Sequence, residues 1–581
     1  MSIDIETYRL KAQEAIEYVF VKEYHNSLGI PMPIVKMLLP DDANYSTGQY
    51  YITIDKTWQI HLNFGKLPIS YHEFQNEVKV LTRHEIEHYM CCPFDVITHF
   101  RMLKRIRDVY YKHFSHLGIN IEYACGAISN QAADIIVDTK NYYRHSKETL
   151  KSEIDWIKIG ANISACPRHC KLMFLTKEAI WKEDLGINET DPEFLKIVHQ
   201  LADSFTKNGI EDKSSFLDKV EEYAEIFFKL YVEDQKNPQQ SSQQGSQQQS
   251  GQQGSQQQSG QQGSQQQSGQ QGSQQQSGQW GVGRPKDGDE HGNAFVFADP
   301  DKVKEAIEVL AEETSVEEFI DLLAIAGIIG MSDKQKGVLW FNVQSANIIP
   351  IVEFSNTGNK SSYTYPSVWR IGDPIEELDL MLTYMTSPRL IPGMTTKKWE
   401  YVSNDDNGTE SKQMDLLLVV DTSGSMGSAM KESANMHQAV LASYGILSYF
   451  ESTKSKVAFI GFSDKIDAYV DWSDKYDDVR ERLLTNGHGG TKFPISRIKS
   501  TLDVRSRDLV TVLITDGDLG NINESVSYFR DYLNDDNKLY IFLLGGSKSL
   551  HSYEPLKNIG AKIYNANNAN EFCDMVLTDM E

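Results

Sequence analysis

The stretch DLLLVVDTSGS, residues 415–425, begins as an almost unbroken apolar run and ends in aspartate, threonine, serine and glycine. A short apolar run without polar alternation is typical of a strand in a parallel sheet that is covered on both faces. Helical patterns, notably at 429–450, separate it from comparable runs at 457–462, 509–514 and 539–544. Strands that alternate with helices in this way predict a doubly wound α/β domain.

Short acidic and hydroxyl side chains follow the first strand, at the edge where such a sheet places its ligands. Asp421, Ser423 and Ser425 offer hard oxygen atoms, which suit Mg²⁺ better than zinc. The loop Gly489-Gly490-Thr491 offers a further hydroxyl, and Asp516 ends another predicted strand. A phosphate-binding loop is the rival interpretation, but the chain contains no G-x-x-x-x-G-K-[ST] pattern.

Together these elements resemble the metal-ion-dependent adhesion site (MIDAS) of von Willebrand factor A (VWA) domains, over residues 414–581. The resemblance implies that Mg²⁺, or another divalent cation, is held directly or through water by Asp421, Ser423, Ser425, Thr491 and Asp516. It also implies that Gly424 and Gly490 give the loops their tight turns. Such a site leaves one position for an acidic side chain, which implies a protein partner.

A second metal motif, His84-Glu85-x-x-His88, lies on a stretch at 73–90 whose apolar spacing predicts a helix. The i, i+4 spacing puts both imidazoles on one face, where they can bind one Zn²⁺ at about 2.0–2.1 Å. Glu85 can take a proton from bound water whose pKa the metal has lowered to about 7. The motif therefore predicts a zinc site with Glu85 as general base.

Zinc needs a third protein ligand, and the best candidate lies on a predicted helix at 130–138. Asp134 and Asp138 share one face of that helix. We expect Asp134 to ligate the metal and Asp138 to hold the free N–H of a ligand histidine. The alternative is that both acids face solvent or pair with Lys140 and Arg144.

This arrangement resembles gluzincin and Asp-zincin metallopeptidases, and more closely the metallopeptidase-like domain found fused to VWA domains in bacteria. One departure is Glu87, because such helices usually carry uncharged residues before the second histidine. A metal-bound but inactive domain, and a helix with two surface histidines, are therefore alternatives. Peptide hydrolysis also needs a group that stabilises an oxyanion, for which the candidates are Tyr142, Tyr143, Arg144 and His99.

A tract of glutamine, glycine and serine at 238–279 contains almost no apolar side chain, so it predicts a disordered tether. We expect strands at 51–54 and 59–64, helices at 300–312 and 315–326, and a buried helix over the apolar stretch 320–331. The predicted organisation is a mainly α (α+β) zincin-like domain at 1–235, a linker at 236–290, a mixed region of unassigned role at 291–412 and the α/β VWA domain at 413–581.

The formal net charge of −24 argues against nucleic acid or an anionic membrane as a partner. The N-terminus lacks the pattern of a signal peptide, and no apolar stretch is long enough to span a bilayer. The six cysteines form no disulfide pattern, which favours a reducing cytoplasm.

Two functions are consistent with these patterns. The first is a zinc-dependent metallopeptidase whose VWA domain recruits a protein partner or substrate through Mg²⁺. The second is a non-catalytic adaptor whose VWA domain docks a MoxR-type AAA+ ATPase, since intracellular VWA proteins of this appearance are commonly partners of such ATPases. No Walker motif occurs in the chain, so any ATP-driven work would come from a separate protein.

Overall fold

The structure is a computed structural model that describes residues 5–42, 50–54, 58–64, 70–160, 163–236, 300–328, 330–346, 362–369, 397–402, 414–505, 508–517, 519–535, 537–544 and 550–566. The chain forms two compact units. Helices α8 (Pro300–Glu312) and α9 (Val316–Ile325) are divided between them. Within the described ranges, every helix is too short or too polar to cross a membrane.

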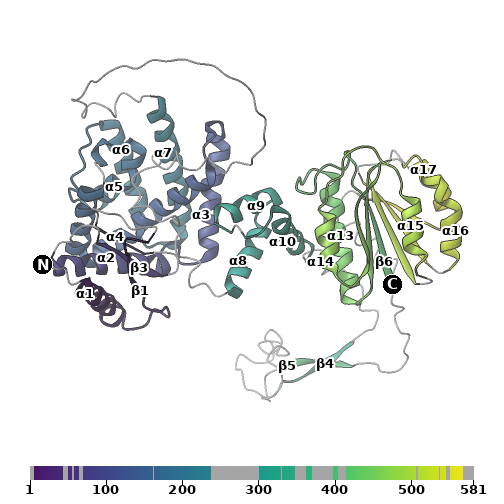
Figure 1. Cartoon of the computed structure of the whole chain (residues 1–581), viewed down its shortest axis with the longest axis horizontal. Helices are drawn as coiled ribbons and strands as arrows, with labels where there is room; N and C mark the ends of the chain where they lie inside the picture. Colours follow the sequence, from purple (N-terminus) through teal and green to yellow (C-terminus); the bar gives the residue numbers. More distant parts are fainter. Residues whose placement is uncertain are drawn as a thin grey trace. The chain divides into compact units, whose positions relative to one another are not determined.

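The first unit contains a small sheet with strand order β1-β3-β2 and is otherwise helical (Figure 1). The central strand β3 (Gln59–Phe64) runs parallel to β1 (Ile34–Met37) and antiparallel to β2 (Tyr50–Ile54). Strands β2 and β3 were predicted, and β1 is additional. The helices are α1 (Ile5–Glu17), α2 (Tyr71–Met90), α3 (Val96–Val109), α4 (Ile121–Gly160), α5 (Arg168–Trp181), α6 (Pro192–Thr206) and α7 (Phe216–Lys236).

Helix α2 begins with a capping box, in which Ser70 Oγ accepts from the Glu73 backbone N–H at 3.4 Å and donates to the Glu73 carboxylate at 3.0 Å. Its apolar side, with Phe74 and Val78, packs into the core that α1 and the sheet share. Lys151 of α4 contacts Glu73 near the start of α2, and Asp138, earlier in α4, contacts α2 near its end. The two helices therefore lie side by side and run in opposite directions.

The second unit is built on a six-stranded sheet with the order β11-β10-β9-β6-β7-β8. All neighbouring strands are parallel except β8, which is antiparallel to β7. The strands are β6 (Asp415–Asp421), β7 (Val457–Phe462), β8 (Ile466–Ser473), β9 (Leu509–Thr515), β10 (Lys538–Leu544) and β11 (Lys562–Ala566). The four predicted strands are present, and β8 and β11 are additional. The strand order reverses between β6 and β9.

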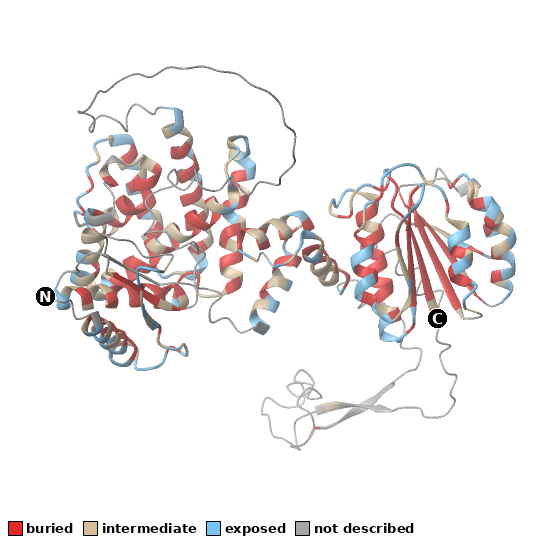
Figure 2. Cartoon of the chain, in the orientation of Figure 1, coloured by how far each residue is buried: buried red, intermediate tan, exposed pale blue. Residues whose placement is uncertain are grey.

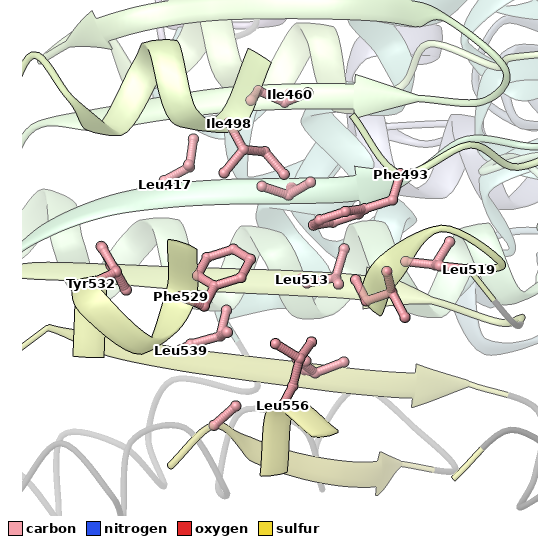
Figure 3. Close-up of a cluster of buried hydrophobic side chains, with 14 of the residues drawn as sticks. Leu417, Ile460, Phe493, Ile498, Leu513, Leu519, Phe529, Tyr532, Leu539 and Leu556 are labelled. Atoms are coloured by element: carbon pink, nitrogen blue, oxygen red, sulfur yellow. The ribbon is translucent and has the colours of Figure 1, made fainter. Parts of the chain in front are cut away.

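Helices cover both faces of this sheet, so its four central strands, β10, β9, β6 and β7, are buried (Figures 1 and 2). On one face an apolar cluster includes Leu417, Leu513 and Phe529, and it packs α15 (Ile495–Leu502), α16 (Val526–Asn534) and α17 (Leu550–Lys557) against alternate strand residues (Figure 3). On the other face lie α13 (Asn435–Ser452) and α14 (Tyr476–Leu483). This is a mixed α/β unit with a mostly parallel sheet.

Part of the region 291–412 also belongs to this second unit. Helix α10 (Asp333–Ala346) packs on α13, and the rings of Trp340 and Phe341 lie 5.4 and 5.2 Å from the His437 ring. A short antiparallel pair, β4 (Ser362–Val368) and β5 (Lys397–Val402), follows in the chain.

Two predicted helices have different bounds in the structure. The buried helix expected over 320–331 is wrong beyond Ile325, because α9 ends there and Gly327 adopts a left-handed φ of 77°. The helix expected from 429 begins only at Asn435, because turns occupy the preceding residues. The capping box predicted for α9 is confirmed by reciprocal hydrogen bonds between Ser315 and Glu318 at 3.2 and 3.3 Å. The predicted tether at 238–279 lies outside the described residues.

Candidate metal sites

The predicted zinc residues come together where α2 passes α4. His84 Nε2 lies 3.1 Å from His88 Nε2, and Asp134 Oδ1 lies 3.4 and 3.2 Å from these two nitrogens. In the part of the chain that the structure describes, these three residues are the only His, Cys, Asp or Glu group whose donors lie close enough to share a metal ion.

Both histidines are held at the ring nitrogen that faces away from this cluster. His84 Nδ1 lies 2.6 Å from Asp138 Oδ1, and His88 Nδ1 lies 2.9 Å from the backbone carbonyl oxygen of Cys92. Both partners can only accept, so a neutral imidazole at either position would carry its hydrogen on Nδ1 and turn the lone pair of Nε2 toward Asp134. Sequence analysis predicted the role of Asp138, but it missed the carbonyl of Cys92.

Three acceptor atoms that converge in this way require a positive charge between them. Asp134 Oδ1 is buried, and the described residues give it no hydrogen bond of normal geometry. Four ligands arranged tetrahedrally about 2.0–2.1 Å from zinc lie about 3.3 Å from one another. The observed separations of 3.1, 3.2 and 3.4 Å therefore fit three corners of a zinc site.

The same convergence shifts the pKa values of the cluster. Burial disfavours a charged His88, but the nearby carboxylate of Asp134 outweighs burial and raises the pKa of His88 to about 9. Burial alone would raise the pKa of Asp134, yet the two imidazoles lower it. Both shifts arise from attraction between the Asp134 carboxylate and positively charged imidazoles, as expected of a site that suits a cation.

Glu85 and Glu87 have different surroundings, although both lie on α2 between the histidines. Glu85 is buried, and its negative charge contributes to the raised pKa of His88. Glu87 is fully buried and ion-paired: Lys140 Nζ lies 2.7 Å away and Arg144 3.0 Å away, and Tyr24 donates to it at 2.9 Å. The charge that departs from the zincin pattern is therefore neutralised by α4.

The alternative pairing of Asp134 and Asp138 with Lys140 and Arg144 is wrong, because Glu87 binds both cations. The alternative that His84 and His88 lie on the surface is also wrong, since both are buried.

Two of the four candidates for the oxyanion role have other partners. Tyr142 donates to Glu183 at 2.9 Å and stacks on Trp181, while Arg144 pairs with Glu87. Tyr143 is exposed and His99 is buried in α3. The structure selects neither of these two.

The predicted magnesium residues meet at the reversal point of the large sheet. Asp421 ends β6 and Asp516 directly follows β9, so both lie at the carboxyl edge where doubly wound sheets bind ligands. Asp421 Oδ1 accepts from the Ser423 backbone N–H at 2.9 Å, the Ser423 and Ser425 hydroxyls are 3.1 Å apart, and Ser425 donates to Asp516 at 3.0 Å. Four of the five predicted oxygen ligands thus form one continuous cluster.

Thr491 is the fifth predicted ligand, and among the residues that the structure describes only a backbone contact of its loop links it to the cluster. The backbone N–H of Gly424 donates to the carbonyl of Gly489 at 3.4 Å, which brings the 487–491 loop beside the aspartate–serine turn. No contact of the Thr491 side chain with the cluster is seen among the described residues.

Sequence analysis missed two side chains that orient the acids of this cluster. Thr515 donates to the second oxygen of Asp421 at 2.7 Å, and Asn435 donates to Asp516 at 3.0 Å. Both follow from the topology, because β9 adjoins β6 and α13 begins at the same edge. Burial raises the pKa of Asp421 despite these hydrogen bonds, so a cation there would relieve an unfavourable charge.

The glycines that matter in these loops differ from those predicted. Neither Gly424 nor Gly490 has a positive φ, and a Cβ on Gly490 would meet nothing within 4 Å. Gly489 has a φ of 111°, and a Cβ on Gly487 would lie 2.6 Å from the carbonyl oxygen of Thr422. The loop therefore needs glycine at 487 and 489, where close approach and left-handed backbone demand it.

Comparisons with known proteins give no family. No family model and no curated protein matches the chain. The crystal structure of a conserved hypothetical protein, BatB from Bacteroides thetaiotaomicron, is similar over 29% of this chain and 97% of its own, with 13% identity and a TM-score of 0.25. An uncharacterized membrane spanning protein from Vibrio fischeri is similar over 28% of this chain and 96% of its own, with 18% identity and a TM-score of 0.13. Likenesses this weak add nothing to the fold, which rests on its own strand order and register.

Proposed function

We propose that this chain is a zinc-dependent metallopeptidase of the zincin type whose C-terminal VWA domain binds a protein partner or substrate through Mg²⁺. The observation that carries the peptidase half is the set of three buried donor atoms, 3.1–3.4 Å apart, on His84, His88 and Asp134. Three protein ligands, with the fourth position left to water or substrate, are typical of catalytic rather than structural zinc.

When bound, zinc would lower the pKa of a water molecule and polarise a scissile carbonyl group. His84, His88 and Asp134 would hold the ion, while Asp138 and the Cys92 carbonyl keep the two imidazoles oriented. Glu85, next to His84 on α2, would accept the proton of the attacking water and pass it to the leaving amine.

The test combines zinc content with hydrolysis of an unfolded protein substrate by the full chain. Glu85→Gln should keep one zinc per chain and lose turnover by a factor of about 10² or more. His88→Ala should lose both, which makes it the control for metal dependence. Equal turnover by wild type and Glu85→Gln would remove the peptidase function.

For the C-terminal domain, support comes from the cluster of Asp421, Ser423, Ser425 and Asp516 at the sheet reversal. An acidic side chain of a partner would complete the coordination of the ion. Partner binding should therefore fail in EDTA and in Asp421→Ala. Binding that survives both treatments would rule out a metal bridge.

One observation favours the second function, a non-catalytic adaptor of a MoxR-type AAA+ ATPase. Two candidate oxyanion donors, Tyr142 and Arg144, are bound to Glu183 and Glu87 rather than free for substrate. An adaptor should still stimulate its ATPase when His88 is replaced by alanine, and should fail to do so when Asp421 is replaced. If the chain is instead a zinc-dependent peptidase, His88→Ala should abolish hydrolysis of the unfolded protein substrate.

A further inference from the structure

Helix α5 carries a lysine that sequence patterns do not mark for any role. Lys177 comes two residues after an apolar run, Leu172 to Leu175, and a lysine there would be expected to extend its amine to solvent. Instead its side chain is 2% exposed and is among the largest fully buried side chains in the described part of the chain. A buried ammonium is costly unless carboxylates surround it, so this position calls for an explanation.

The carboxylates that receive Lys177 connect it to the zinc site. Its Nζ donates to Asp138 Oδ2 at 2.6 Å and to Glu153 Oε1 at 2.9 Å. The other oxygen of Asp138 holds His84 Nδ1 at 2.6 Å. A continuous chain of short contacts thus runs from the metal-facing imidazole through Asp138 and Lys177 to Glu153.

The register of α5 against α4 is fixed beside this chain. Trp181, one turn after Lys177, donates from its indole N–H to Thr139 at 3.0 Å and stacks on Tyr142 at 4.7 Å. Thr139 is the neighbour of Asp138, so these contacts set the height at which Lys177 meets that carboxylate. Burial disfavours the ammonium, but Asp138 and Glu153 outweigh burial and raise the pKa of Lys177, which keeps it charged.

We propose that Lys177 is a positioning residue for the zinc site: it fixes Asp138 so that one oxygen faces His84, and thereby keeps the Nε2 lone pair of His84 directed at the metal. This inference rests on the proposed zinc site. Loss of Lys177 would remove the 2.6 Å hydrogen bond to Asp138 Oδ2, and the buried carboxylate could then rotate or take up a proton. Either change would release His84 Nδ1 from the geometry that zinc requires.

The experiment measures zinc affinity of the full chain by competition with a chromophoric chelator. Lys177→Met should weaken zinc binding about 10–100-fold, the usual cost of losing an outer partner of a metal ligand. Lys177→Arg, which keeps the charge, should recover most of the affinity. Lys171→Met is the control, because Lys171 lies on the same helix, is also buried, and pairs with Glu189 at 2.9 Å rather than with a metal-site residue.

A double-mutant cycle separates positioning from general destabilisation. If Lys177 acts through Asp138, then Lys177→Met should cost little further affinity in a chain that already carries Asp138→Asn. The visible spectrum of the Co²⁺-loaded chain should change in Lys177→Met and not in Lys171→Met. Should Lys177→Met fail to fold, Lys177→Gln replaces it, with a smaller expected loss of zinc affinity because its amide can still donate to Asp138; Lys171→Gln, its control, should lose none.

The outcomes distinguish this inference from the proposed function. A wild-type chain that does not bind zinc would overturn the zinc site itself. A wild-type chain that binds zinc, with equal affinity in Lys177→Met or full additivity with Asp138→Asn, would overturn only the role of Lys177.

Discussion

Replacing Glu87 by glutamine should destabilise the first unit strongly while leaving its zinc affinity unchanged. Glu87 is fully buried and joins α2 to Lys140 and Arg144 of α4. Removal of one partner from a buried ion pair costs about 3–5 kcal/mol. Here the cost should lie near the lower value, about 3 kcal/mol, because Arg144 is 49% exposed and Lys140 keeps Glu211 at 3.2 Å.

Scanning calorimetry of the full chain can measure this effect. The transition of the first unit is the one that moves upward when zinc is added. A loss of about 3 kcal/mol should lower that transition by about 6–12 °C in a unit of this size. Tyr24→Phe, which removes one hydrogen bond to Glu87 and leaves both cations, should cost about half as much.

Zinc affinity, measured in parallel by chelator competition, is the second half of the prediction. Glu87 contacts none of the three donor residues, so its loss should change the zinc dissociation constant less than threefold. An unchanged transition would show that the buried ion cluster does not stabilise the unit. A zinc affinity that falls tenfold or more would show that Glu87 belongs to the metal site, contrary to the contacts described above.

Three further perturbations test other parts of the molecule. Thr515→Val removes the hydrogen bond to buried Asp421 and should destabilise the second unit by about 1.5–3 kcal/mol, measured by urea denaturation in EDTA; a loss below about 0.5 kcal/mol would contradict this. Gly487→Ala should abolish Mg²⁺ binding measured by titration calorimetry, whereas Gly490→Ala, in open space, should not; equal behaviour would refute the close approach at 487. Burial alone would raise the pKa of Asp234, but its imidazole and guanidinium partners outweigh burial and lower this pKa. The Asp234 carboxylate therefore stabilises the first unit above about pH 4, and this stabilisation is lost as the pH falls through the lowered pKa. The difference in unfolding free energy between wild type and Asp234→Asn should therefore vanish at low pH. A difference that grows at low pH would contradict a lowered pKa for Asp234.

The second unit was largely predictable because its candidate metal ligands lie at strand ends. Once four buried strands alternate with helices, the topology alone brings Asp421 and Asp516 to one edge. The missed strand β8 is mostly half-buried and carries acids at 467 and 471, so it shows no apolar run. The contribution of Thr515 needed the register of β6 against β9, which the sequence does not contain.

The candidate zinc ligands were predictable only where they follow a helical period. His84 and His88 are related by one turn, as are Asp134 and Asp138, so each pair could be placed on a face. The contact between α2 and α4 depends on tertiary packing, which the sequence pattern does not show. The same is true of the Cys92 carbonyl that accepts from His88 and of the burial of Lys177. The sequence shows Glu87 only as a charge in an unexpected place, because its partners lie more than 50 residues away.

The contact between α2 and α4 is unusual in being held by buried charges, and we infer that these charges specify its register. A slip of one helical turn would move Asp134 by about 5.4 Å, more than the spacing of the three donor atoms. Three separate pairings oppose such a slip: Arg83 with Glu148, Glu87 with Lys140, and His84 with Asp138. Since all three agree on one register, loss of Glu87 should weaken the unit without moving the donors. This is why stability and zinc affinity should separate in Glu87→Gln, whereas in Lys177→Met, at the His84 side of the interface, zinc affinity itself should fall.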